Sequence, residues 1–97
     1  MSDRELIERQ ARILKALANE SRLMIVSRLG RGECSAGELT RMVGSDQTTV
    51  SKHLAVLRAN GIVSSRRKGN VLFYRLLTPC VLNFFSCASR VLKERVS

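Results

Sequence analysis

The sequence predicts a mainly α-helical domain that carries one small β-hairpin, with elements in the order α-α-α-α-β-β-α. Two observations predict this class. Apolar residues recur at helical spacing over most of the chain, and two short segments rich in β-branched and aromatic residues flank a Gly-Asn turn. A chain of 97 residues is expected to form a single domain, residues 1–97, with one modest core.

Two amphipathic helices are predicted at the start of the chain. The first runs from about Arg4 to Ala18. Asn19 is expected to cap the second helix, which ends at Gly30 and is followed by a short turn to Cys34. The apolar residues expected to be buried on the second helix are Leu23, Ile25, Val26 and Leu29.

The next segment predicts two helices joined by a tight turn. Ser35 and Glu38 fit a capping box at the start of a short third helix. The turn Gly44-Ser45-Asp46 ends that helix, and Asp46 is expected to cap a fourth helix that runs to about Asn60. Two helices joined by a three-residue turn that contains Gly are typical of a helix-turn-helix.

A hairpin and a last helix complete the predicted fold. Strands are expected at Ile62–Arg67 and Val71–Leu76, around a basic tip at Lys68-Gly69-Asn70. Thr78-Pro79 predicts a cap followed by the first turn of the last helix. Its apolar stripe is wide for a lone terminal helix, so a second subunit is expected to cover it. A hairpin placed after a helix-turn-helix gives a winged helix-turn-helix.

Positive charge is concentrated in the second half of the chain. The net charge is +9, and from Asp46 onward nine basic residues accompany only two acidic ones, Asp46 and Glu94. This imbalance favours a polyanionic partner such as nucleic acid, although a basic face kept for solubility gives the same count. The opening residues do not resemble a signal peptide and no apolar run reaches membrane-spanning length, so we expect a cytoplasmic protein without a membrane partner.

The fourth predicted helix has two different faces. Val50, Leu54 and Leu57 fall together and are expected to face the core. The opposite face and the helix start carry hydroxyl-bearing or amide side chains suited to reading base edges in a major groove: Gln47, Thr48, Thr49 and Ser51, together with the cation Lys52, with Ala55 leaving room for close approach. The hairpin residues Arg66, Arg67 and Lys68 are expected to clamp phosphates or the minor groove, or else to protect a strand edge by their charge.

His53, the only histidine, lies beside the core-facing stripe, which favours a structural hydrogen bond. No sequence motif pairs it with a Ser or Cys nucleophile, and there is neither a Gly-rich phosphate loop nor a plausible acid pair, so an enzyme is not expected. The three cysteines are odd in number and lack Cys-x-x-Cys spacing, which indicates reduced thiols and no structural zinc site.

Taken with these motifs, the chain resembles the ArsR/SmtB family of winged-helix repressors from about Leu14 to Leu92. The segments that carry the resemblance are Leu14–Leu23, Ser35–Leu39, Thr49–Leu57 and Gly61–Leu76. The resemblance implies a homodimer formed through the first and last helices and repression of an operon by binding double-stranded DNA with an inverted repeat. It also implies release of that DNA when a metal ion, metalloid or oxidant binds.

The sensing sites of that family do not carry over. Where arsenic and cadmium sensors have Cys-x-Cys, this chain has Ser35 and Gly37, with Cys34 one step earlier, and the last helix lacks the His of the zinc-type site. The candidate metal or redox ligands are therefore the three cysteines, Cys34, Cys80 and Cys87, with arsenite, another soft metal ion or thiol oxidation as the inducer and no required cofactor.

Geometry limits what the last-helix cysteines can do. Cys80 and Cys87 are seven positions apart, roughly 10 Å along one helix, which is too far for a disulfide or a shared ion without help from another element. The alternative is that they are inert packing residues of a dimer interface. The main hypothesis is a homodimeric, sequence-specific repressor; the alternatives are a non-specific basic nucleic-acid-binding protein and a protein-interaction module that has lost DNA binding.

Overall fold

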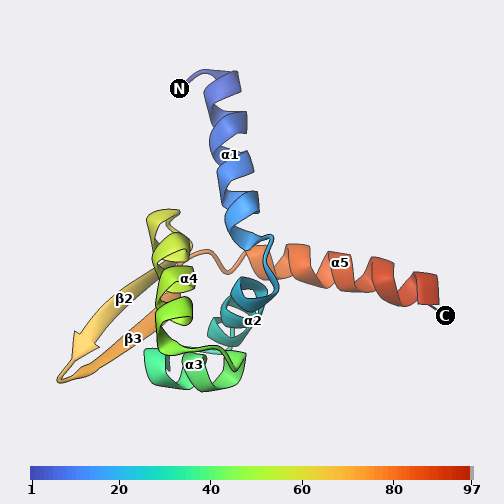
Figure 1. Ribbon diagram of the computed structural model, residues 1–97. Helices are drawn as coiled ribbons and strands as arrows, with labels where there is room; N and C mark the ends of the chain where they lie inside the picture. Colours follow the sequence, from blue (N-terminus) through green and yellow to red (C-terminus); the bar gives the residue numbers. More distant parts are fainter. Residues whose placement is uncertain (97) are drawn as a thin grey trace.

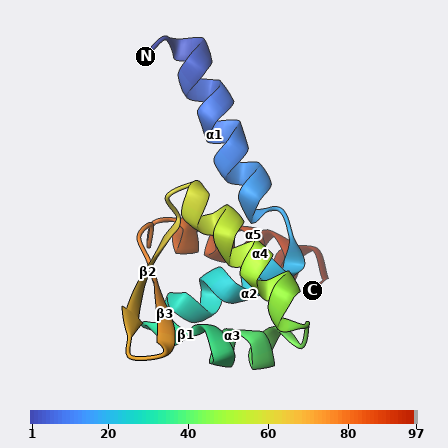
Figure 2. The same cartoon turned by 60° about the vertical axis from the view of Figure 1, so that its left-hand side comes forward.

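The computed structural model describes residues 1–96, and Ser97, the last residue of the expected domain, lies outside the described residues. Figure 1 shows the predicted winged helix-turn-helix order, and the additional strand β1 is labelled in Figure 2. The elements are α1 (Asp3–Leu17), α2 (Glu20–Leu29), β1 (Cys34–Ser35), α3 (Ala36–Val43), α4 (Gln47–Ala59), β2 (Val63–Lys68), β3 (Val71–Leu76) and α5 (Val81–Val96).

Side-chain caps start the three central helices, as predicted. Asn19, Ser35 and Asp46 each accept a hydrogen bond from the backbone N–H of the third residue after them, at 3.1, 3.2 and 2.7 Å. Each cap satisfies one of the N–H groups that the first turn of a helix leaves without a partner. Gly44 ends α3 in the left-handed conformation, with φ of 78°.

The expected two-stranded hairpin is a three-stranded antiparallel sheet in the order β1-β3-β2. The turn predicted between α2 and Cys34 therefore ends in a strand, because Cys34 pairs with Tyr74 and Ser35 pairs with Phe73. A two-residue strand is too short to show alternation, and its pairing partner lies far along the chain. β2 also begins one residue later than predicted, at Val63.

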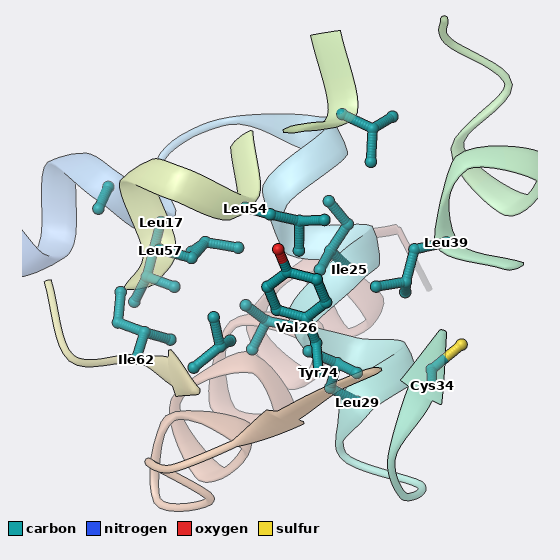
Figure 3. Close-up of a cluster of buried hydrophobic side chains, with 13 residues drawn as sticks. Leu17, Ile25, Val26, Leu29, Cys34, Leu39, Leu54, Leu57, Ile62 and Tyr74 are labelled. Atoms are coloured by element: carbon teal, nitrogen blue, oxygen red, sulfur yellow. The ribbon is translucent and has the colours of Figure 1, made fainter. Parts of the chain in front are cut away.

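The core lies between α2, α3, α4 and the sheet (Figure 3). Val50, Leu54 and Leu57 of α4 are buried, as predicted, and Tyr74 reaches the same core from β3. Leu72 and Leu76, expected on the same strand face, are half-buried against it. The buried cluster consists of Ala16, Leu17, Ile25, Val26, Leu29, Cys34, Leu39, Val50, Leu54, Leu57, Ile62, Val63 and Tyr74.

Leu23 was predicted to be buried, and this is wrong: its side chain is 37% exposed. On α2, Ile25, Val26 and Leu29 face the core. One turn earlier, the same face is occupied by Arg22, which lies three residues before Ile25 and four before Val26. Leu23 lies about 100° around the helix from Arg22 and so leaves the core-facing stripe.

The prediction for the start of α5 is also wrong. Thr78 does not cap the helix with its side chain; its hydroxyl oxygen is buried and has no hydrogen-bond partner in the described part of the chain. The N–H groups of Val81 and Leu82 instead bond to carbonyls three residues back, at 3.1 Å each. This tight turn delays the α-helix to Val81, so Cys80 lies in the turn before α5 and not on the helix.

α1 and the later part of α5 project from the central body (Figure 1), whereas Val81 and Phe85 at the start of α5 pack against the core. Only the last turn of α1 contributes buried residues, Ala16 and Leu17. The radius of gyration is 14.6 Å, above the about 13 Å typical of a compact domain of this length. None of the described helices combines the length and apolar character needed to cross a membrane.

Apolar side chains remain exposed on both projecting helices. On α1, Ile7 is 64% exposed and Leu14 is 53% exposed. On α5, Phe84 and Leu92 are 63% and 64% exposed. The apolar stripe predicted for the last helix is therefore uncovered in the isolated protomer at Phe84, Val91 and Leu92, whereas Val81 and Phe85 of the same stripe pack against the core.

Candidate DNA-binding surface

The outer face of α4 is exposed in the protomer. Gln47, Thr48, Ser51 and Lys52 are all exposed, whereas Thr49 is half-buried and its N–H is bonded to the Asp46 carboxylate. Short side chains dominate this face, so a flat or grooved partner can approach the helix backbone closely. Thr49 is the one predicted contact that is partly withdrawn.

A cap fixes the start of α4, and two polar contacts tie the helix to the rest of the protein. Asp46 caps its start, and the backbone N–H of Thr49 lowers the pKa of that carboxyl below its ordinary value. Arg58 near its end donates to the Ser65 hydroxyl of β2 at 3.2 Å. In the middle, Arg22 Nε donates to His53 Nδ1 at 3.1 Å. The structural hydrogen bond predicted for His53 is thus confirmed.

A groove of about 490 Å³ runs between α3, α4 and the hairpin. Gln47 and Ser51 line it from α4, Arg67 and Asn70 line it from the hairpin, and Arg41 lines it from α3. Arg41 and Asn70 were not predicted from the sequence to lie at this surface. Arg41 is a charged residue on the exposed side of a short helix, and its place beside α4 depends on how the two helices pack. Asn70 was treated only as a turn residue.

The three predicted basic residues of the hairpin do not act together. Successive residues of a strand point to opposite faces, and Arg66 pairs with Phe73 whereas Arg67 pairs with Leu72. Arg67 lines the groove beside α4. Arg66 lies on the other face, over the Phe73 ring at 5.4 Å from its centroid. Lys68 is exposed at the end of β2.

Arg66 is also held by an ion pair that the sequence did not indicate. Its Nε and Nη2 donate to the two carboxylate oxygens of Glu33 at 2.8 and 2.7 Å. This hydrogen bonding lowers the pKa of the Glu33 carboxyl, the largest of several influences, and raises the pKa of Arg66. The guanidinium is thus engaged within the protein, whereas within residues 1–96 no hydrogen bond or ion pair engages that of Arg67.

The three cysteines lie in different surroundings. Cys34 is buried in β1, and its thiol donates to the Glu38 carboxylate at 3.3 Å. Burial first, and then this hydrogen bond, raise the pKa of Cys34, so the thiol stays protonated. The Glu38 carboxylate therefore bonds this thiol in place of the Ser35 N–H expected in a capping box.

Cys80 and Cys87 are exposed thiols, one in the turn before α5 and one on α5. Within residues 1–96 no three side chains among His, Cys, Asp and Glu come together to hold a metal ion. A single protomer therefore does not assemble the three candidate cysteines into one site.

The chain is similar in sequence to proteins of a known family. The sequence profile of the arsR family of bacterial regulatory proteins matches residues 19–65. The biofilm growth-associated repressor of Xylella fastidiosa is 48% identical over 66 residues, which are 68% of this chain and 58% of that protein. An uncharacterized HTH-type transcriptional regulator of Mycobacterium tuberculosis is 33% identical over 102 residues, covering 100% of this chain and 90% of the relative. The match to the Xylella repressor thus spans less than two thirds of that protein.

Solved structures agree along almost the whole chain. The homodimeric winged helix-turn-helix DNA-binding domain of a possible ArsR-family regulator from Mycobacterium bovis has a TM-score of 0.81 at 35% identity, covering 99% of this chain and 91% of that one. The transcriptional repressor BigR from Xylella fastidiosa has a TM-score of 0.77 at 36% identity, covering 94% and 96%. This chain belongs to the ArsR family of bacterial regulatory proteins.

Proposed function

We propose that this protein is a homodimeric, sequence-specific transcriptional repressor that places α4 in the major groove of operator DNA. The observation that carries the proposal is the exposed face of α4 beside the groove where Arg41 and Arg67 flank Gln47 and Ser51. Short polar side chains in the centre suit base edges, and a cation on either side suits the phosphate backbone. Such a repressor would work in the cytoplasm and would need no bound cofactor to hold DNA.

The exposed apolar faces of α1 and α5 support the dimer. Phe84 and Leu92 of α5 are each more than three-fifths exposed in the protomer. Ile7 and Leu14 of α1 are exposed apolar side chains on a second helix. A twofold-related copy would bury both faces. Its symmetry would be matched by an inverted repeat in the operator, with half-site centres about one DNA turn apart.

The recognition helix is tested with an operator selected from a random-sequence duplex pool. The double variant Thr48→Ala with Lys52→Ala should lose preference for the operator over bulk DNA. Arg67→Ala should weaken binding to all duplexes alike and reduce the salt slope by about one. Arg9→Ala, which removes the same charge from the exposed part of α1, is the matched control. Equal losses of specific and non-specific binding in the double variant would contradict the assignment of α4.

The net charge of +9 favours one rival function, a basic protein that coats nucleic acid without regard to sequence. The two functions differ in a competition titration. A repressor should prefer its operator over bulk DNA by about a thousandfold or more. A coating protein should show no such preference and should bind every duplex with the same salt slope.

The proposed inducer is a thiophilic species, arsenite or a similar soft metal ion, acting on Cys80 and Cys87. These two thiols are exposed at the α5 end of the protein, whereas Cys34 is buried and protonated. Thiolates prefer soft ions over magnesium or calcium. If α5 contributes to the dimer, occupation of these thiols would shift one subunit against the other, and a coupling of about 1–3 kcal/mol would lower operator affinity 5- to 150-fold.

The inducer is tested by titrating the operator complex with arsenite. The wild type should release DNA, and Cys80→Ser with Cys87→Ser should not. Cys34→Ser should have a partial effect if that thiol reaches the same site. Oxidation is the competing trigger and would appear as a disulfide-linked dimer on a non-reducing gel. A double variant that still responds fully would reduce the two thiols to packing residues.

A further inference from the structure

We propose that Glu33 and Arg66 form a brace across the sheet that positions the hairpin for DNA, without touching DNA themselves. The proposal rests on the repressor function above and assigns a positioning role to two residues outside the contact surface. It gives Arg66 a role different from the DNA contact predicted for its neighbours Arg67 and Lys68.

The brace spans all three strands. Arg66 lies on β2, its register partner Phe73 lies on the central strand β3, and Glu33 directly precedes β1. To reach Glu33, the Arg66 side chain crosses over the Phe73 ring, at 5.4 Å from the ring centroid. Two hydrogen bonds of 2.7 and 2.8 Å then fix the plane of the guanidinium against the carboxylate. A paired, stacked guanidinium has little freedom to swing toward another anion.

The brace lies on the face of the sheet opposite the DNA-facing groove. The groove is lined by Arg67, and strand alternation turns Arg66 away from it. A smaller hollow on the far face is lined by Glu33, Arg66 and Phe73, together with Ser64, Ser65 and Arg75. Arg75 and Lys68 act on Glu33 as additional positive charges, so its carboxylate remains ionised beside Arg66.

The hairpin needs such a support because its outer half packs against little else. Arg66, Arg67 and Lys68 are all exposed, and Figure 2 shows the tips of β2 and β3 at the edge of the molecule. A small rotation at the base of a hairpin moves its tip by a larger distance. The expected contact of Arg67 with DNA therefore depends on the angle of the hairpin, which the brace sets.

The test compares Glu33→Gln, Arg66→Gln and the charge-swapped variant that combines Glu33→Arg with Arg66→Glu. Each single variant should weaken operator binding by about two- to fivefold, with the salt slope of the wild type. The charge swap should recover part of the lost affinity and not all of it, because Arg75 and Lys68 would then lie near a cation at position 33. Glu33→Gln is the most informative change, since it removes a negative charge, which raises the net charge by one, and yet should bind the operator more weakly.

Amide hydrogen exchange provides a readout without DNA. The backbone N–H groups of Lys68 and Val71 should exchange faster in both single variants and recover in the charge swap. Tighter operator binding by Glu33→Gln, a salt slope reduced by about one in Arg66→Gln as in Arg67→Ala, or a charge swap that fails to recover would each overturn the brace. A wild type without operator preference would instead overturn the repressor function, and the exchange data would still decide on the brace.

Discussion

The difference between buried and exposed leucines predicts two separable effects of one chemical change. Leu57 on α4 is 0% exposed, in the centre of the core. Leu57→Ala removes three carbon atoms from a site that the surrounding side chains cannot fully refill, which typically costs about 2.7–5 kcal/mol. For a domain of this size that loss corresponds to a melting temperature at least about 10 °C lower.

Leu92→Ala is the matched comparison, because the same three atoms are removed from a side chain that is 64% exposed in the protomer. Only about a third of the side chain is covered, so the loss of protomer stability should be about 1 kcal/mol or less. If α5 packs on a second subunit, Leu92→Ala should instead weaken the dimer, while Leu57→Ala leaves the affinity between folded protomers unchanged.

Urea unfolding followed by circular dichroism measures the first effect, and sedimentation equilibrium over a range of concentrations measures the second. A loss below about 1 kcal/mol in Leu57→Ala would refute the core described for α4. A folded wild-type monomer at micromolar concentration, or a dimer that is indifferent to Leu92→Ala, would refute the interface on α5.

Three further predictions follow from local geometry. The pKa of Asp46 is lowered in the folded protein, so its carboxylate stabilises the fold at neutral pH. That contribution is lost as the pH falls through the pKa of Asp46 in the folded protein. In thermal melts, Asp46→Asn should therefore lose less stability than the wild type between about pH 5 and pH 2. Because Cys34 is buried with a raised pKa, iodoacetamide should modify the two exposed cysteines first, and early labelling of Cys34 in a mass spectrum would contradict its described environment. Gly44→Ala places a side chain at φ of 78° and should destabilise the protein by about 1–2 kcal/mol in urea unfolding, whereas Gly37→Ala, inside α3 with ordinary contacts, should be neutral or stabilising.

The features predicted correctly from the sequence are those with local signals. The inward face of α4 follows from helical spacing, and the caps Asn19, Ser35 and Asp46 follow from residue type and position. The outer face of α4 could be predicted for the same reason, since helical spacing determines the face on which each side chain lies.

The features that were missed depend on residues far apart in the chain. β1 is two residues long and pairs with a strand almost forty residues later, so no periodicity in the sequence predicts it. The Glu33–Arg66 ion pair joins residues 33 positions apart, and three adjacent basic residues in a sequence give no sign that one of them is already paired. Which basic residue of the hairpin faces the groove depends on the placement of β2 in the folded sheet, and the position of Arg41 depends on how α3 packs beside α4.

Ser35 is at once the second residue of β1, paired with Phe73, and the cap of α3. The sheet and the helix-turn-helix therefore share one residue, with no linker between them. In the proposed repressor, the base of the sheet and the start of α3 would meet DNA together. A signal that releases DNA would then act most directly on the spacing between the two protomers. New operator preferences would arise by exchanging side chains on α4, with the backbone beneath them left in place.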